Sequence, residues 1–375
     1  VPNLRFPGFE GEWERKKLGE VAEIFKGKGI SKEQLSLEGI PCILYGELYT
    51  KYKSEIISEV ISRTNINEFG LVKSKSNDVI IPASGETAID ISTARCVVYD
   101  DVLLGGDLNI LRLKNDNGVF LSYQINGRRK FDIAKLAQGI SVVHLYGERI
   151  KTLNVYFPNI AEQTQIASFL SLIDERIATQ MKTIEEWRIL RKGYWKAIYS
   201  NYECREYRMG EIAEIGRGRV ISTTEINNQN NPKYPVYSSQ TSNDGIMGYL
   251  DTFDFEGEFI TWTTDGANAG TVFYRNGKFN CTNVCGTIKL KTNHNPYFVA
   301  ESLQQETKKY VSINLANPKL MNNVMSSIKI ELPDIKVQNK ISFLFQSIDK
   351  KINLEKSLLI AYQQQKKYLL QNLFI

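Results

Sequence analysis

The chain has 375 residues, of which 42% are hydrophobic and 24% charged, and its formal net charge is +5. A chain of this length can form two or more domains with their own cores, and its composition is that of an ordinary soluble protein. No stretch is apolar over the length that a bilayer crossing needs, the N-terminus has no signal-peptide pattern, and the five cysteines are scattered, so we expect a reduced, cytoplasmic protein.

The chain begins with a lead-in and then a short segment that is repeated later. Residues 1–17 are rich in proline, glycine and charge, which predicts an extended conformation. Residues 18–31 recur as residues 209–222 with mostly identical side chains. A repeat of this kind indicates two related structural units.

Each copy of this border segment is followed by β-type runs and then by a helical stretch. The first set of runs lies at 40–45, 78–81, 96–99 and 108–113, and the second at 234–238, 258–263, 271–274 and 287–291. We expect helices at 120–137 and 296–309. The two stretches therefore predict mixed α/β domains with the same order of elements but different interiors.

A longer repeat follows each mixed domain. Residues 157–199 recur as 332–374 at a shift of 175 positions, so that Pro158 corresponds to Pro333. Each copy starts with this proline and carries apolar residues spaced alternately by four and three, which predicts a coiled-coil helix. A helix of about 40 residues is roughly 60 Å long. Two such helices are longer than one compact domain needs.

Polar residues interrupt the apolar seam at matching places in both helices. If the helices pack antiparallel with facing residues summing to 546, Arg191 lies opposite Glu355 and Gln180 lies opposite Lys366. Single polar positions inside a seam can fix its register. We therefore expect these four residues to set how the two helices align.

The sequence contains little that supports catalysis or metal binding. The glycine pattern at 25–29 resembles a cofactor loop, but its repeat at 216–220 loses both ends of that pattern, and no phosphate-binding loop of the Walker type occurs. The Asn-Pro-Tyr-Phe run at 295–298 is more typical of a helix start than of a methyltransferase loop. With two histidines and only one close cysteine pair, we expect no catalytic residue, no metal and no bound cofactor in this chain.

Clusters of basic residues are the best candidates for contacts with nucleic acid. Two of these clusters are repeated pairs, Lys26 with Lys28 and Arg217 with Arg219, and each pair has a glycine between its two cations. On a strand this spacing would place both cations on one face, and the glycine would let another backbone approach closely. His144, just before the border of the first long helix, is expected to be structural or to contact DNA rather than to be catalytic. The full set of candidates is Lys26, Lys28, Arg217, Arg219, Lys73, Lys75, Arg128, Arg129, Lys130 and His144.

These features together resemble the specificity (S) subunit of type I restriction–modification systems, over nearly the whole chain. The resemblance is carried by the opening segment 4–13, the repeated borders at 18–24 and 209–215, and the helix starts with Phe157-Pro158, Glu162-Gln163 and Ile173-Asp174, repeated as Leu332-Pro333, Gln338 and Ile348-Asp349. The second helix start departs from the family, because Val337 stands where the family usually has glutamate.

The resemblance implies an α+β fold with two mixed α/β target-recognition domains in a pseudo-two-fold repeat, separated by two long antiparallel coiled-coil helices. Its domains would be 1–156 and 201–331, and its helices 157–200 and 332–375. Each domain would read one half of a bipartite, asymmetric DNA site. The helices would dock two adenine-N6 methyltransferase subunits, which carry S-adenosylmethionine, and restriction subunits would add ATP- and Mg²⁺-dependent cleavage.

Two other classes of function, an enzyme acting alone and a structural scaffold, are alternatives to a DNA specificity subunit. A methyltransferase or nuclease acting alone would require the isolated chain to bind S-adenosylmethionine or metal. A coiled-coil scaffold without a DNA role would not require two differing, basic α/β domains. Gel-shift measurements on the chain, alone and with methyltransferase partners, distinguish these possibilities, and we expect weak binding alone that partners sharpen.

Overall fold

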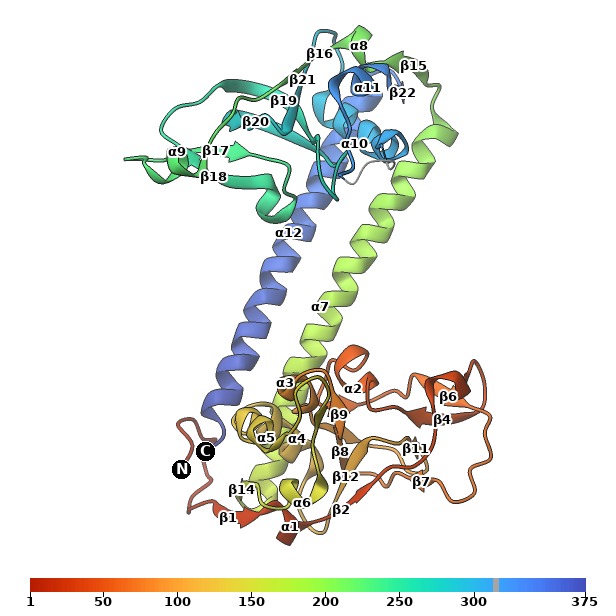
Figure 1. Cartoon of the computed structure of the whole chain (residues 1–375), viewed down its shortest axis with the longest axis vertical. Helices are drawn as coiled ribbons and strands as arrows, with labels where there is room; N and C mark the ends of the chain where they lie inside the picture. The colour runs from red at the N-terminus through yellow and green to blue at the C-terminus, as the bar shows by residue number, and fades with distance from the viewer. Residues whose placement is uncertain (313–316) are drawn as a thin grey trace. The chain divides into compact units, whose positions relative to one another are not determined.

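The computed structural model describes residues 1–312 and 317–375. The chain divides into two compact units, unit 1 with residues 1–184 and 355–375 and unit 2 with residues 185–354. The two long helices, α7 (Ile160–Asn201) and α12 (Ile335–Asn372), are continuous and contribute residues to both units (Figure 1). The compact units therefore cut through the helices, whereas the sequence-based division treated domains and helices as separate segments.

Unit 1 contains two five-stranded sheets, with strand orders β2-β12-β8-β10-β5 and β3-β6-β4-β11-β7, and two short strand pairs, β1-β14 and β13-β9. Apart from the parallel pairs β10-β5 and β11-β4, neighbouring strands are antiparallel. Its elements are β1 (Glu14–Lys17), α1 (Leu18–Val21), β2 (Ala22–Lys26), β3 (Leu35–Ser36), β4 (Ile40–Ile43), α2 (Glu47–Thr50), β5 (Ile56–Ile57), β6 (Ser62–Thr64), β7 (Val72–Lys73), β8 (Asp78–Pro82), β9 (Ser84–Gly85), α3 (Ala88–Ile91), β10 (Arg95–Val97), β11 (Leu103–Leu104), β12 (Leu108–Leu113), α4 (Gly118–Asn126), α5 (Lys130–Leu136), β13 (Val143–His144), α6 (Gly147–Ile150) and β14 (Asn154–Phe157).

Unit 2 contains one six-stranded sheet, with strand order β16-β21-β19-β20-β17-β18, and the pair β15-β22. Its elements are β15 (Arg205–Arg208), α8 (Met209–Ile212), β16 (Ala213–Arg217), α9 (Thr223–Asn227), β17 (Tyr234–Tyr237), β18 (Ile246–Leu250), β19 (Phe255–Thr263), β20 (Val272–Cys281), β21 (Cys285–Leu290), α10 (Pro296–Glu306), α11 (Asn322–Ser327) and β22 (Lys329–Leu332). No helix in the described part of the chain is both long and apolar enough to cross a membrane.

The two units share a framework and differ in what is added to it. The strand order β2-β12-β8-β10 in unit 1 corresponds to β16-β21-β19-β20 in unit 2. In each unit the strand just before the repeated border segment, β1 or β15, pairs with the strand just before a long helix, β14 or β22. Every β-type run expected from the sequence overlaps a strand, so the predicted α+β fold with an internal repeat is confirmed. The next strand in each sheet, β5 or β17, also corresponds, because it pairs in parallel with β10 or β20. Unit 1 adds a second five-stranded sheet, whereas unit 2 adds strand β18 beside β17.

Both helices expected within the mixed domains are interrupted. The helix predicted at 120–137 is two helices, because the chain turns at Gly127, where an added Cβ would lie 2.9 Å from the carbonyl oxygen of Leu370. The helix predicted at 296–309 is α-helical to Glu306 and then tightens into a 3₁₀ turn over Thr307–Tyr310. Such a turn is a common way to end a helix.

A repeated buried glutamine ties each long helix to its own mixed domain. In unit 1, Gln163 donates to the carbonyl of Pro158 (2.9 Å) and accepts from the backbone N–H of Asn117 (2.9 Å). In unit 2, Gln338 makes the same two kinds of bond, and Asn295 donates to it at 2.9 Å. Because each asparagine caps the N-terminus of the next helix, the two glutamines join α7 to α4 and α12 to α10.

Candidate nucleic-acid interface

Three side chains on the surface of unit 1 form the best candidate contact site for nucleic acid. The Lys26 ammonium lies 5.9 Å from the ring centroid of Tyr146, and the ring centroids of Tyr146 and His144 are 6.2 Å apart. All three side chains are exposed. The Lys26 cation can attract a phosphate, and the two exposed rings can stack on bases.

A groove of about 950 Å³ adjoins this surface. Asp107 lines the groove and accepts a hydrogen bond from the Ser84 hydroxyl (3.0 Å), and Ser84 lies opposite His144 in the β9-β13 pair. The groove is also lined by Ile30, whose φ of +61° is rare for a β-branched residue. Backbone strain of this kind occurs where surrounding structure imposes it, and such positions cluster at binding sites.

The other basic candidates of unit 1 are spread over the domain rather than gathered at this surface. Lys73 forms an ion pair with Glu68 at 2.9 Å, and Arg129 donates to the carbonyl of Ile375 at 2.6 Å. Lys130 lies on a cavity lined by helix residues of the same unit, and its burial lowers its pKa. Lys28, Lys75 and Arg128 are exposed or partly exposed without a common cluster. Their binding to DNA stays a prediction.

The glycine between the repeated cations has a structural role that the sequence did not reveal. An added Cβ at Gly27 would overlap the carbonyl oxygen of Gly105, and one at Gly218 would overlap the carbonyl oxygen of Cys281. The backbone that approaches each glycine therefore belongs to the protein itself. The expectation that this glycine lets another backbone approach closely is therefore confirmed, and the approaching strand is the chain's own.

The corresponding cations of unit 2 are held by side chains of the same unit. Arg219 forms ion pairs with Glu225 at 2.5 Å and with Asp254 at 3.1 Å. Arg217 donates to the side-chain carbonyl of Asn322 at 2.8 Å. Two carboxylates beside Arg219 cancel its charge, so the repeated pair is less available to a phosphate in unit 2 than in unit 1.

Unit 2 instead presents loops rich in amide and hydroxyl groups. Residues 238–245 form one loop, whose exposed Asn243 and Asp244 have left-handed φ values of +48° and +53°. The Arg275 guanidinium holds this loop, since it pairs with Asp244 at 2.6 Å and lies 3.7 Å from the ring centroid of Tyr237. The side-chain amide of Asn268 donates to the Thr241 hydroxyl (3.1 Å), which brings a second loop alongside.

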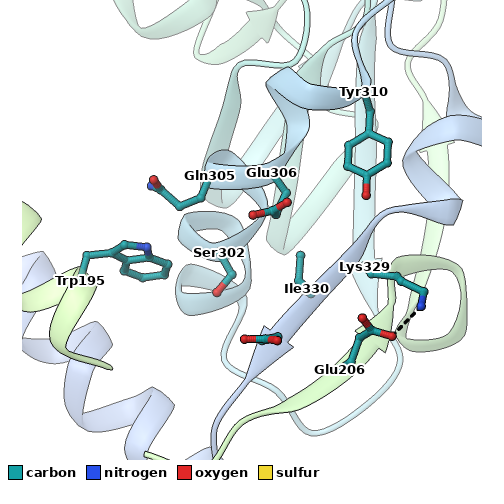
Figure 2. A pocket seen from close by; sticks show the side chains of 9 residues that line it. Trp195, Glu206, Ser302, Gln305, Glu306, Tyr310, Lys329 and Ile330 are labelled. Atoms are coloured by element: carbon teal, nitrogen blue, oxygen red, sulfur yellow. Dashed lines mark hydrogen bonds and ion pairs between the residues drawn. The ribbon is translucent and has the colours of Figure 1, made fainter. Parts of the chain in front are cut away.

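A cavity of about 470 Å³ in unit 2 has the opposite electrostatic character (Figure 2). Glu206, Glu306 and Glu331 line it, and its one lysine, Lys329, is paired with Glu206 at 2.6 Å. An excess of carboxylates repels phosphates, so this cavity is not part of the candidate DNA surface. Within the described residues, no group of three or more His, Cys, Asp or Glu side chains could hold a metal ion.

The register predicted for the two long helices is wrong. The described contacts give Arg191, Lys366 and Gln180 partners other than those that the predicted register assigns. Gln180 donates instead to the carboxylate of Glu355 and to its backbone carbonyl (3.2 Å). The prediction paired polar residues within the apolar seam and took no account of repeated acids beside that seam.

These acids pair with the cations in a pattern that repeats between the units. Lys366 Nζ lies 2.5 Å from Asp174 Oδ1 in unit 1, and Arg191 Nε lies 2.9 Å from Asp349 Oδ1 in unit 2. The shift of 175 positions relates both acids and both cations. Pairing each repeated acid with the repeated cation on the other helix would have found this arrangement from the sequence.

Each ion pair is completed by a tyrosine and a second acid from the mixed domain of its own unit. In unit 1, Tyr123 donates to Asp174 (2.7 Å) and Glu55 lies 2.5 Å from Lys366. Burial, together with the nearby Glu55 charge, raises the pKa of Asp174. For Glu55 burial acts in the same upward direction, but the charges of Lys366 and Arg95 outweigh it, and its pKa is lowered.

The cluster in unit 2 is built in the same way. Tyr297 donates to Asp349, and Glu301 lies 2.8 Å from Arg191. Burial raises the pKa of Glu301, although the Arg191 charge opposes that effect. In both units, therefore, a cation from one long helix joins an acid of the other helix to the mixed domain.

The fold and its repeated framework match one protein family over most of the chain. The family of the type I restriction modification DNA specificity domain matches residues 10–186 and 201–361, so the chain belongs to this family. It is therefore a specificity subunit, which supplies the DNA sequence specificity of a type I restriction–modification system.

The individual relatives agree with this assignment. A putative type I specificity subunit of Mycoplasma pneumoniae, S.MpnORF289P N-terminus, is 43% identical over 147 residues, which are 39% of this chain and 78% of the relative. The specificity subunit of the type I restriction enzyme MpnII, from the same organism, is 39% identical over 168 residues, 44% of this chain and 50% of that protein. The crystal structure of the type I S subunit from M. genitalium has the same fold, with a TM-score of 0.70, 20% identity, and coverage of 100% of this chain and 99% of that one.

Proposed function

We propose that each unit of this specificity subunit reads one half of a bipartite, asymmetric DNA site. The observation that carries the proposal is a shared framework with different surfaces. Unit 1 offers Lys26, His144 and Tyr146, whereas unit 2 offers the amide- and hydroxyl-rich loops around Asn243 and Asn268. Different donors and acceptors select different base edges, so the two half-sites would differ in sequence.

We further propose that α7 and α12 dock two methyltransferase subunits. Both helices carry apolar side chains that are exposed in this chain, which is typical of surfaces that another subunit covers. They are Leu172, Met181, Ile189 and Leu190 on α7, and Leu354, Leu358 and Ile360 on α12. A partner with a complementary apolar helix face would bury these residues.

The chemistry would then reside in the partner subunits. Methyltransferase subunits would bind S-adenosylmethionine and methylate adenine at N6, and restriction subunits would use ATP and Mg²⁺ to translocate and cleave DNA. In this assignment our chain contributes recognition and assembly. It would have no step of its own in the reaction.

Methylome sequencing of cells that express the chain with its methyltransferase partners tests this proposal. We expect N6-methyladenine in a motif of two unlike specific parts separated by unspecified bases. A contiguous motif, a palindromic motif, or no methylation in the presence of assembled partners would contradict the proposal.

A further inference from the structure

The acidic cavity of unit 2 is lined by the C-terminal end of α10 and by the strand pair β15-β22 (Figure 2). Its charged lining consists of the carboxylates of Glu206, Glu306 and Glu331 and the ammonium of Lys329. Glu206 and Glu331 stand directly opposite each other in the β15-β22 pair. Like charges in facing positions of a strand pair are unfavourable. The lining therefore favours a positively charged guest.

Two of the three carboxylates have ion-pair partners, and the third is available. Lys329 pairs with Glu206 at 2.6 Å, and both side chains are about half exposed. Lys309, which is 65% exposed, pairs with Glu306 at 2.7 Å. Ion pairs at such exposed places contribute little stability. Glu331 has no ion-pair partner among the described residues, so its charge is the one that a guest would meet.

A buried hydroxyl without a partner is the second feature of this cavity. Ser302 is 2% exposed, and its Oγ has no hydrogen-bond partner within the part of the chain that the structure describes. Figure 2 shows this hydroxyl directed into the cavity. Most buried polar atoms in proteins are hydrogen-bonded. A guest that donates a hydrogen bond here would pair an atom that the fold leaves unpaired.

The internal repeat shows how the cavity arises. Ser302 corresponds to Gln124 of unit 1, because both stand at the same distance from the N-cap asparagine of their helix. The Gln124 side chain donates to the carbonyl of Tyr156 (2.6 Å) and accepts from its N–H (3.0 Å). Tyr156 corresponds to Glu331 at the shift of 175 positions. Serine is too short to make these bonds, so unit 2 is open where unit 1 is filled.

Unit 1 also shows which chemical group suits this place. The Arg129 guanidinium lies 4.7 Å from the ring centroid of Tyr156. At the same distance from its helix cap, unit 2 has Thr307, which is fully buried and donates to the carbonyl of Gly270 (2.6 Å). This position of unit 2 therefore supplies no guanidinium. A carboxylate, that of Glu331, stands where unit 1 has the ring that receives one.

We infer that the acidic cavity of unit 2 binds the guanidinium of an arginine side chain that a partner protein chain presents. The guanidinium pairs with the Glu331 carboxylate and donates to the Ser302 hydroxyl. Arginine fits better than lysine, because its planar fork of five donors serves both acceptors, whereas an ammonium is a compact, strongly hydrated charge. Free arginine fits less well, because its own carboxylate would enter an acidic site. The inference does not depend on DNA recognition.

Saturation-transfer NMR on the full chain tests this inference with capped tripeptides. The probes are Gly-Arg-Gly, Gly-Lys-Gly and Gly-citrulline-Gly, each acetylated and amidated, together with free arginine. We expect saturable binding of the arginine peptide, at least about threefold tighter than that of the lysine peptide. Citrulline keeps the shape of arginine without its charge, so its peptide should not bind measurably. Free arginine should bind more weakly than the arginine peptide.

Variants of the chain locate the binding at this cavity. Glu331→Gln should weaken the arginine peptide about tenfold, since a hydrogen bond to a charged group contributes about that much. Ser302→Gln copies unit 1 and should fill the cavity and remove binding, with thermal unfolding unchanged. Glu256→Gln is the matched control and should change nothing, because Glu256 is an exposed acid of unit 2 that pairs with Lys278 (3.6 Å) away from the cavity.

Four results would overturn the inference. They are the absence of saturable binding, equal binding of the arginine and citrulline peptides, and an affinity that neither Glu331→Gln nor Ser302→Gln changes. The fourth is tighter binding of free arginine than of the arginine peptide, which would mean a site for a small molecule instead of a partner chain.

Discussion

The charge of a basic side chain is available to a phosphate only where the protein's own acids do not neutralise it. Lys26 lies beside the Tyr146 ring, whereas Arg219 lies between two carboxylates. In the complex with methyltransferase partners, we expect Lys26→Ala to weaken DNA binding and to reduce the slope of log affinity against log salt by about one. Binding titrations at several salt concentrations measure both effects.

Arg219→Ala is the matched comparison for this prediction. Because the Arg219 guanidinium is already paired with two carboxylates of unit 2, removal of this side chain should leave the slope of log affinity against log salt nearly unchanged. If Arg219→Ala reduces the slope as much as Lys26→Ala does, the assignment of the available charge to unit 1 is wrong.

His294 introduces a pH dependence into unit 2 that unit 1 lacks. Burial lowers its pKa, and its Nδ1 lies 3.0 Å from the Gln338 side-chain amide. The corresponding amide in unit 1 donates to the Asp116 carboxylate. Because the unfolded histidine binds a proton more readily than the folded one, the stability of unit 2 should fall as pH falls through the unfolded pKa, which is about 6.5.

Hydrogen exchange measured unit by unit between pH 7.5 and 5 checks this effect. Peptides from around α10 and the start of α12 should lose protection on acidification. His294→Asp, which imitates unit 1, should remove the loss, provided that the amide of Gln338 donates to the new carboxylate. Equal loss in the variant would show that another group is responsible.

At the scale of elements, the clusters around Lys366 and Arg191 attach each mixed domain to both long helices. Lys366 is 14% exposed and faces two acids that are 6% and 9% exposed. Lys366→Met would leave those acids without a cation, and we expect unit 1 to lose about 3–5 kcal/mol of stability. Arg191→Met should cost unit 2 less, because Asp349 is 36% exposed.

The pH dependence of the Lys366→Met variant has a definite sign. Without the lysine, burial and mutual repulsion would raise the folded pKa of Glu55 and Asp174 above their unfolded values. The folded variant then binds protons more tightly, so its stability should fall as pH rises through those folded values. Chemical denaturation at pH 4 and pH 7.5 should show a larger deficit at pH 7.5, and an equal deficit at both would contradict the account.

The sequence predicts some elements well and others poorly, for physical reasons. The long helices and the framework strands could be found because apolar periodicity and an internal repeat are properties of the chain alone. The helix register could not be found from the seam, since Asp174 and Asp349 lie beside it and are fixed by tyrosines from the mixed domains. The role of Gly27 was also hidden, because its neighbour Gly105 is distant in sequence.

The candidate site shows the same division between local and distant information. Lys26 and His144 were predicted separately, and the structure brings them together around Tyr146, which was missed. An aromatic residue two positions after a candidate histidine was the available signal. The sequestration of Arg219 could not be predicted, because Asp254 approaches it only when the sheet of unit 2 forms.

At the scale of the whole molecule, the chain is two versions of one framework that share their two long helices. The framework strands and the buried glutamines repeat, whereas the second sheet of unit 1 and strand β18 of unit 2 do not. Under the proposed function, in which each unit selects its own half-site, the parts that differ between the units determine the sequence that each unit selects. The interior of unit 2 should therefore be replaceable without any effect on what unit 1 recognises.

A methylome of cells carrying an exchanged chain tests this central claim most directly. Residues 223–320 would be replaced by the corresponding segment of another specificity subunit, with the partners and both helices unchanged. We predict that one half of the methylated motif changes while the other half and the number of bases between them stay the same. A change in both halves, or a motif that no longer divides into two parts, would contradict the account.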